Sequence, residues 1–152
     1  MRYAYSVIPD AIEREILIDA PVEVVWRVVT EPSQIVQWFS DEAEIELRVG
    51  GGGRLAFKRS GDSYQLQIEA VEPPHRFVWR WVQPEGSVVR QGNSMLVEFT
   101  LQPEGTGTRL RVVESGFDQV DWSDERKAHY ADNHTRGWHS ILDRLRDYAP
   151  GA

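Results

Sequence analysis

The chain has 152 residues, of which 41% are hydrophobic and 27% charged, a composition typical of one globular domain with a substantial core. The net charge of −7 argues against a nucleic-acid-binding surface, because phosphate contacts require clustered Lys and Arg. Cysteine is absent, which excludes disulfides and thiolate metal sites and fits a reducing compartment. Since no apolar run has the length of a signal peptide or a membrane span, we expect a cytoplasmic protein without membrane insertion.

The first predicted elements are a strand and two short helices. The strand is predicted by an imperfect period of two, in which Ile12, Arg14, Ile16 and Ile18 alternate with Glu13, Glu15, Leu17 and Asp19. Apolar residues on one face then predict a helix, which ends at Glu31 because the residue before a proline is disfavoured in a helix. A second short helix is expected over residues 33–39.

The middle of the chain predicts an antiparallel meander. The expected strands cover residues 44–49, 54–58, 64–70, 77–82, 95–101 and 109–113, and most of them are separated by turns rich in Gly or Pro. Most of these strands have one apolar and one polar face, as expected for a sheet that is covered on one side only. The glycines at 50–53 predict a turn and not a phosphate-binding loop, because no Lys-Ser/Thr pair follows and no helix begins there.

The last predicted element is a long amphipathic helix over residues 124–148. Inward-facing residues recur every three or four positions: Tyr130, His134, Trp138, Ile141, Leu142, Leu145 and Tyr148. A single long helix that follows a whole sheet is expected to lie across the sheet and close it. Gly137, inside this helix, costs about 0.5–1 kcal/mol relative to alanine. We therefore expect it to allow the close approach of a strand or loop, or a slight bend.

Five stretches in this order resemble a known superfamily: IDAPVEVVWRVVTEP followed by WF, ELRVGGGGRLAF, VEPPHRFVWRW, GTGTRLRVVESGF and RGWHSILDRL. The chain resembles the START-like or SRPBCC superfamily and, within it, homologues of the activator of the heat-shock chaperone ATPase. The resemblance implies an α+β helix-grip fold, as in the birch pollen allergen. A seven-stranded curved antiparallel sheet would wrap around the long C-terminal helix, with two short helices between strands 1 and 2. We expect residues 1–152 to form one such domain, with its core at about 12–148.

Members of the superfamily often hold an apolar cavity between sheet and helix, so the inward-facing side chains are candidates for ligand contacts. The candidate ligand-binding residues are Phe57, Tyr64, Leu66, Trp79, Trp81, Phe99, Leu110, Glu114, Tyr130, His134 and Trp138. An aromatic-lined pocket would suit a lipid-like or polyketide-like molecule. The same rings would alternatively fill the space under a curved sheet, and the sequence leaves both alternatives open. No cofactor is expected.

Two polar residues are predicted to face the same interior. Glu114 continues the inward parity of Leu110, and His134 lies on the inward face of the last helix. A carboxylate that orients an imidazole can support a general base, with Tyr64 or Tyr130 as a hydroxyl donor. We expect these groups to orient a ligand and not to catalyse a reaction. A cyclase or hydratase that uses His134 and Glu114 is one alternative.

The other alternative is an interaction module related to chaperone regulation or the stress response. Its protein partner would contact the loop at 83–92 and the short helices.

A metal site is not expected. His129, His134 and His139 are five residues apart, which rotates each by about 140° from the previous one around a helix. They therefore cannot share one face as the paired histidines of HExxH do, and that motif is absent. The sequence has no G-x-S-x-G motif and no Cys, so acyl-transfer chemistry has no support either.

Overall fold

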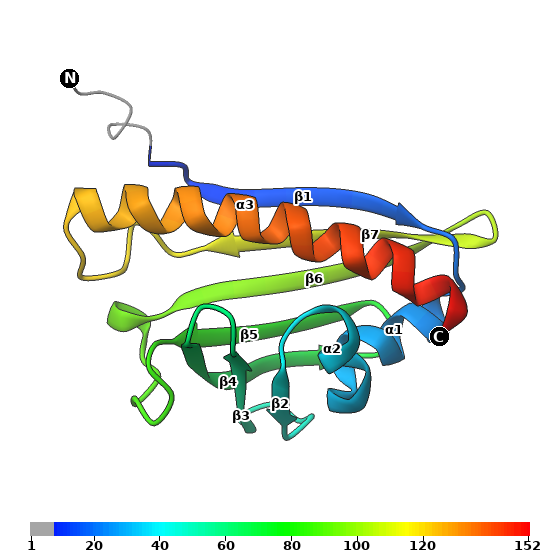
Figure 1. Cartoon of the computed structure of the whole chain (residues 1–152), viewed down its shortest axis with the longest axis horizontal. Helices are drawn as coiled ribbons and strands as arrows, with labels where there is room; N and C mark the ends of the chain where they lie inside the picture. Colours follow the sequence, from blue (N-terminus) through cyan, green and yellow to red (C-terminus); the bar gives the residue numbers. More distant parts are fainter. Residues whose placement is uncertain (1–7) are drawn as a thin grey trace.

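The computed structural model describes residues 8–152. A seven-stranded antiparallel sheet curls around one long C-terminal helix (Figure 1). This confirms the predicted α+β helix-grip architecture, including the two short helices between the first two strands. In chain order the elements are β1 (Ala11–Ile18), α1 (Val22–Thr30), α2 (Pro32–Trp38), β2 (Glu42–Ile45), β3 (Gly52–Phe57), β4 (Asp62–Glu72), β5 (Arg76–Val82), η2 (Gln91–Asn93), β6 (Met95–Glu104), β7 (Gly107–Ser115), α3 (Asp124–Tyr148) and η3 (Ala149–Gly151).

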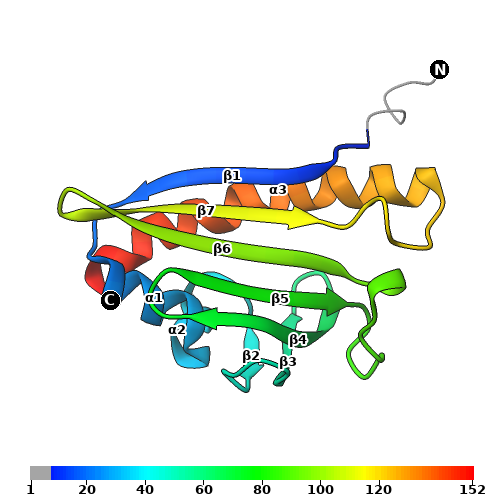
Figure 2. The same ribbon diagram turned by 180° about the vertical axis from the view of Figure 1, so that it is seen from behind.

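The sheet has the order β1-β7-β6-β5-β4-β3-β2, and every neighbouring pair is antiparallel. Strands β2 to β7 therefore form a simple meander, and β1 joins its far edge beside β7. Seen from behind, the sheet lies in front of α3, so the helix covers one face only (Figure 2). This arrangement explains the alternation of apolar and polar residues along most strands.

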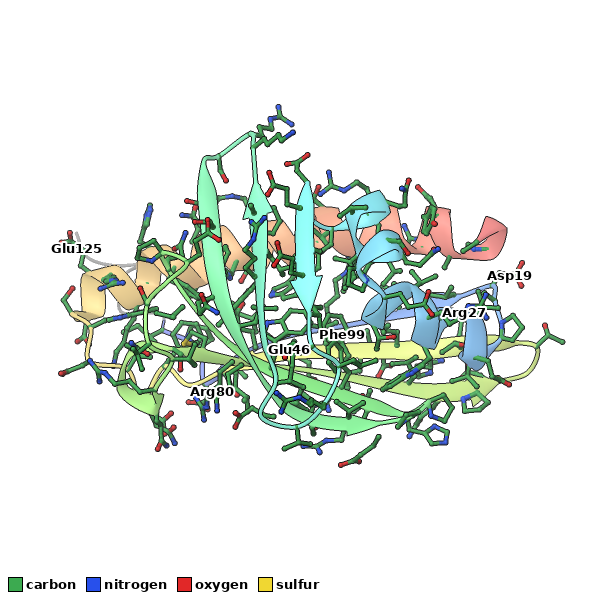
Figure 3. The ribbon with its side chains drawn as sticks, turned by 90° about the horizontal axis from the view of Figure 1, so that it is seen from below. Asp19, Arg27, Glu46, Arg80, Phe99 and Glu125 are labelled. Carbon is green, nitrogen blue, oxygen red and sulfur yellow. The ribbon has the colours of Figure 1, made fainter. Side chains whose placement is uncertain are left out.

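The core lies between the sheet, α3 and the two short helices. Phe77, Trp79 and Phe99 are at most 1% exposed, and Figure 3 shows Phe99 in the middle of the molecule. Leu142 and Leu145 from α3 are fully buried in the same apolar cluster. Burying a large apolar side chain contributes roughly 1.5–3 kcal/mol, so this cluster accounts for much of the stability. The C-terminal end of the chain lies beside α1 (Figure 1).

The predicted second strand is too long at its C-terminal end. The structure ends β2 at Ile45, and Leu47 and Val49 are 42% and 66% exposed instead of alternating into the core. Residues 50–51 exchange backbone hydrogen bonds of 2.8 Å with Ile68, so the chain turns towards β4 before β3 begins. The glycines give the turn conformation, as predicted, with a φ of 83° at the first of them.

The long helix begins and ends where the sequence predicts. The Ser123 hydroxyl caps its N-terminus by accepting a 3.2 Å hydrogen bond from the backbone N–H of Arg126. Arg14 of β1 fixes the middle of the helix, because its guanidinium donates to the His139 carbonyl and, at 2.9 Å, to Asp143. Among residues 8–152, none of the helices combines the length and apolarity that crossing a membrane requires.

Candidate functional site

A cleft of about 560 Å³ lies between the N-terminal half of α3 and the strands β3 to β5. Seven of the eighteen residues that line it are aromatic: Phe39, Phe57, Tyr64, Trp81, Trp122, Tyr130 and Trp138. The polar side chains on the wall include His134, Asn133 and Arg126 from α3. The wall therefore combines aromatic rings with several polar groups, which could fix the orientation of a small molecule.

Glu114, near the end of β7, is fully buried directly behind this wall. Its Oε2 accepts hydrogen bonds from the Tyr130 hydroxyl and, at 2.9 Å, from the Trp81 indole. Its Oε1 accepts from His134 Nδ1 and from the Trp138 indole, both at 2.9 Å. All four donors line the cleft, so one carboxylate determines the orientation of four side chains of the wall.

The environment of Glu114 keeps its carboxylate ionised. Burial acts to raise its pKa, but the charge interaction with His134 and the hydrogen bonds from His134, Tyr130 and Trp138 outweigh it, and the pKa lies below the ordinary 4.5. An indole N–H can only donate, and one indole bonds to each carboxylate oxygen. Both oxygens therefore act as acceptors, as an ionised carboxylate requires.

The imidazole of His134 is held in one orientation. Its ring stacks on Tyr130 with centroids 3.7 Å apart and planes 18° apart, and it meets Trp81 edge-on. Nδ1 bonds to Glu114, while Nε2 lies 3.4 Å from the Tyr64 hydroxyl oxygen, which is also part of the cleft wall. Burial, more than the nearby Asp62 and Glu114 charges, raises the pKa of Tyr64, so this hydroxyl keeps its proton.

The fold and these side chains can be compared with known proteins. The sequence profile of the family described as "Activator of Hsp90 ATPase homolog 1-like protein" matches residues 19–149, which is most of the chain. The chain belongs to this family. The match confirms the resemblance that the five sequence stretches indicated. No curated protein matches the sequence.

Three solved structures show how far the similarity of this family member extends. Protein MLL2253 from Mesorhizobium loti is 26% identical, with a TM-score of 0.75, over 90% of this chain and 94% of that one. DynU16, described as a putative protein in the dynemicin biosynthetic locus, is 26% identical, with a TM-score of 0.72; 92% of this chain covers 47% of that one. The Aha1 dimer from Colwellia psychrerythraea is 17% identical, with a TM-score of 0.74, over 91% and 95% of the two chains, and this similarity shows the fold alone.

The structure separates the candidate site residues of this family member into two groups. Those in the cleft wall are Phe57, Tyr64, Trp81, Tyr130, His134 and Trp138, with Glu114 immediately behind them. Those in the packed core, at most 1% exposed and outside the cleft wall, are Leu66, Trp79, Phe99 and Leu110. The role of either group in ligand binding stays a prediction.

Sequence reasoning missed several residues of the wall. Phe39 follows the second short helix, and its ring lies 5.4 Å from the Trp138 ring, centroid to centroid. Trp122 precedes α3, where Arg126 stacks over its ring at 4.2 Å. Arg126 and Asn133 lie on the same helical face as Tyr130 and His134, so the periodicity of α3 contains the signal that could have identified them.

The interpretation of Gly137 as a site of close approach is wrong. A Cβ placed there would meet no atom of residues 8–152 within 4 Å, and the residue lies in the wall of the cleft. The missing side chain leaves space for the cleft beside Trp138.

The described part of the chain, residues 8–152, has no group of three or more His, Cys, Asp or Glu side chains that could hold a metal ion.

Proposed function

We propose that this protein binds an apolar or aromatic small molecule, lipid-like or polyketide-like, in the cleft between the sheet and α3, without covalent catalysis. The observation that carries the proposal is the buried carboxylate of Glu114, which accepts hydrogen bonds from four side chains of the cleft wall. A solid core needs no such group, because burying a charge costs several kcal/mol before its partners compensate, at an order of magnitude. We infer that the free-energy cost of burying Glu114 is retained because the carboxylate holds those four side chains in one arrangement.

The size and composition of the cleft support the same function. Its volume of about 560 Å³ falls within the range of small-molecule sites. The Tyr64 and Trp81 rings, which both line the cleft, stack on each other with centroids 4.4 Å apart and so form a rigid aromatic part of its wall. The similar DynU16 is described as a putative protein in the dynemicin biosynthetic locus, which agrees with a small-molecule ligand for this chain.

Native mass spectrometry of the freshly purified protein tests this proposal, together with a variant that fills the cleft. The wild type is expected to carry an additional mass that is lost on denaturation. Gly137→Leu places a side chain in the cleft and is expected to remove that mass, and to lower the affinity for an added naphthalene-type fluorophore at least tenfold. Ser140→Leu adds the same side chain to the exposed side of α3 and should leave binding unchanged.

Two results would contradict the proposal. One is a wild-type protein that carries no additional mass and shows no thermal shift with any of a panel of lipids and aromatic compounds. The other is a Gly137→Leu variant that is folded, by circular dichroism, and binds as tightly as the wild type and Ser140→Leu.

Proton-transfer catalysis is a second candidate, favoured by the geometry of His134. An imidazole in a cleft wall whose Nδ1 is bonded to a carboxylate, and whose Nε2 lies beside a tyrosine hydroxyl, has the arrangement of a general base. A cyclisation or hydration rate should then fall at least a hundredfold in His134→Gln while the substrate still binds. Loss of binding without any measurable reaction in the wild type would favour the non-catalytic function.

Chaperone binding is the third candidate, because the family description names a chaperone ATPase activator. The loop at 83–92 exposes 80% of Val88, an apolar side chain available to a protein partner. A pull-down with the host chaperone at micromolar concentration tests this candidate. Recovery that is lost in Val88→Asp would support it, and no recovery of the chaperone by the wild type would contradict it.

A further inference from the structure

Two polar groups of the cleft wall, the His134 imidazole and the Tyr64 hydroxyl, determine which hydrogen-bonding pattern a ligand can satisfy beside them. Because the Glu114 carboxylate accepts at both oxygens, the proton shared with His134 belongs to Nδ1. In the neutral imidazole Nε2 is then an acceptor. The Tyr64 hydroxyl, whose pKa is raised by burial, is a donor. At a pH at which the imidazole is neutral, one acceptor and one donor therefore lie side by side at the cleft wall.

These two groups satisfy each other poorly. The distance of 3.4 Å between Tyr64 Oη and His134 Nε2 lies beyond the usual length for a hydroxyl donor. The rings cannot easily move closer, since Tyr64 is stacked on Trp81 and His134 on Tyr130. A ligand atom that both donates and accepts would complete both groups, and among common oxygen groups only a hydroxyl does so.

Building on the proposed function, we propose that the cleft selects aromatic ligands with a ring hydroxyl, that is, phenols or enols of planar ring systems. The ligand hydroxyl donates to His134 Nε2 and accepts from the Tyr64 hydroxyl. Its ring lies against the aromatic wall formed by Phe39, Phe57, Trp81 and Trp138.

The charge behind the wall favours this class over two others. The ionised Glu114 makes the bonded imidazole a stronger acceptor, which favours the acidic hydroxyl of a phenol over that of an aliphatic alcohol. The same negative charge, buried at 0% exposure, disfavours a ligand carboxylate at this position.

A matched pair of probes tests the proposal on the wild-type protein. 2-Naphthol donates and accepts, whereas 2-methoxynaphthalene has the same ring system and can only accept. Titration by fluorescence or calorimetry is expected to show 2-naphthol binding about tenfold more tightly, the scale of one to two net hydrogen bonds. Simple partitioning would give the opposite preference, because the methyl ether is the more apolar compound.

Two tyrosine variants separate the cleft hydroxyl from tyrosine hydroxyls in general. Tyr64→Phe keeps the ring on Trp81, removes the donor, and should lower the 2-naphthol affinity about fivefold or more. Tyr148→Phe removes a hydroxyl that bonds to Gln34 at 2.6 Å, outside the cleft, and should leave the affinity unchanged. Circular dichroism and thermal unfolding establish that both variants fold.

The outcomes distinguish this proposal from the proposed function on which it rests. If both probes bind equally, or the ether binds more tightly, hydroxyl selection is overturned while ligand binding in the cleft stands. If Tyr64→Phe binds 2-naphthol as the wild type does, the paired donor and acceptor are overturned. If neither probe binds, and no other aromatic compound does, both proposals fall together.

Discussion

The two halves of α3 cover the same sheet in different ways. In the C-terminal half Leu142 and Leu145 are fully buried in the apolar core. In the N-terminal half the helix presents Tyr130 and His134 to an open cleft, with a buried carboxylate between helix and sheet. The C-terminal half of α3, here called the closed half, thus stabilises the fold by apolar packing, whereas the N-terminal half, the open half, borders the cleft.

The boundary between the closed and the open half passes between two tryptophans of β5. Trp79 is buried, and its indole Nε1 has no hydrogen-bond partner among residues 8–152, which costs roughly 1–3 kcal/mol and is offset by burial of the large ring. Trp81, two residues further along the same face, donates its indole N–H to Glu114. The closed half thus relies on apolar packing, and the open half on a hydrogen-bonded network.

Replacing the centre of that network should have the largest effect. Glu114→Gln removes the charge and turns an amide N–H₂ group towards donors, so at least one of the four donors loses its acceptor. We expect the free energy of unfolding to fall by about 3–5 kcal/mol, and ligand affinity to fall as well. Urea denaturation and probe titration measure the two quantities.

The matched control for Glu114→Gln is Glu98→Gln on the outer face of the sheet. Glu98 pairs with Arg76 near the surface, and its loss should cost no more than about 1 kcal/mol. If both variants lose the same stability, the buried carboxylate does not hold the open half together.

A truncation in the closed half should separate stability from binding. Leu142→Ala removes fully buried apolar atoms and should lower the free energy of unfolding by about 2–5 kcal/mol. Because Leu142 does not line the cleft, the affinity for an aromatic probe should stay within about twofold of the wild type under folding conditions. A folded Leu142→Ala protein that no longer binds the probe would mean that the two halves are not independent.

Low pH should reduce the free energy of unfolding, because protonation of Glu114 weakens the hydrogen-bonded network of the open half. Its pKa in the folded state is below the ordinary 4.5, so the stabilisation is complete above pH 4.5 and is lost as the pH falls through the folded-state pKa. Surface carboxylates with lowered pKa values, such as those of Glu104 and Asp143, act equally in wild type and variant. The difference in unfolding free energy between wild type and Glu114→Gln should therefore narrow below pH 4.5, and a constant difference would contradict the role of the ionised carboxylate.

The sequence was sufficient to predict the fold because its patterns are local. Alternation along the strands and the three- to four-residue period of α3 report which face is covered, and the bounds of α3 agree with the structure. The pattern failed after Ile45, where Leu47 and Val49 continue the alternation but leave the sheet. Backbone hydrogen bonds between residues 50–51 and Ile68 determine that departure, and side-chain patterns do not report them.

The candidate site was predictable only in part, for a related reason. The alternation along β7 and the periodicity of α3 predicted that Glu114 and His134 face the same interior. In the structure His134 Nδ1 lies 2.9 Å from Glu114 Oε1. Parity could not distinguish the filled part of the interior from the cleft, because Trp79 and Trp81 have the same parity on the same strand. That distinction depends on how far α3 and the curved sheet diverge, which arises from packing of the whole chain.

The smallest effect on stability is expected from replacing Gly137 of α3 by alanine, which adds only a methyl group at the cleft wall. The added Cβ would meet no atom of residues 8–152 within 4 Å, and alanine removes the cost of a helical glycine. Gly137→Ala should therefore stabilise the protein by about 0.5–1 kcal/mol and raise Tm by roughly 1–4 °C. Gly107→Ala is the matched opposite, since its Cβ would lie 2.6 Å from the Ile18 carbonyl oxygen and should lower Tm. Calorimetry of both variants measures the difference. A lower Tm for Gly137→Ala would contradict this expectation. It would mean that the backbone conformation of α3 at this position requires glycine.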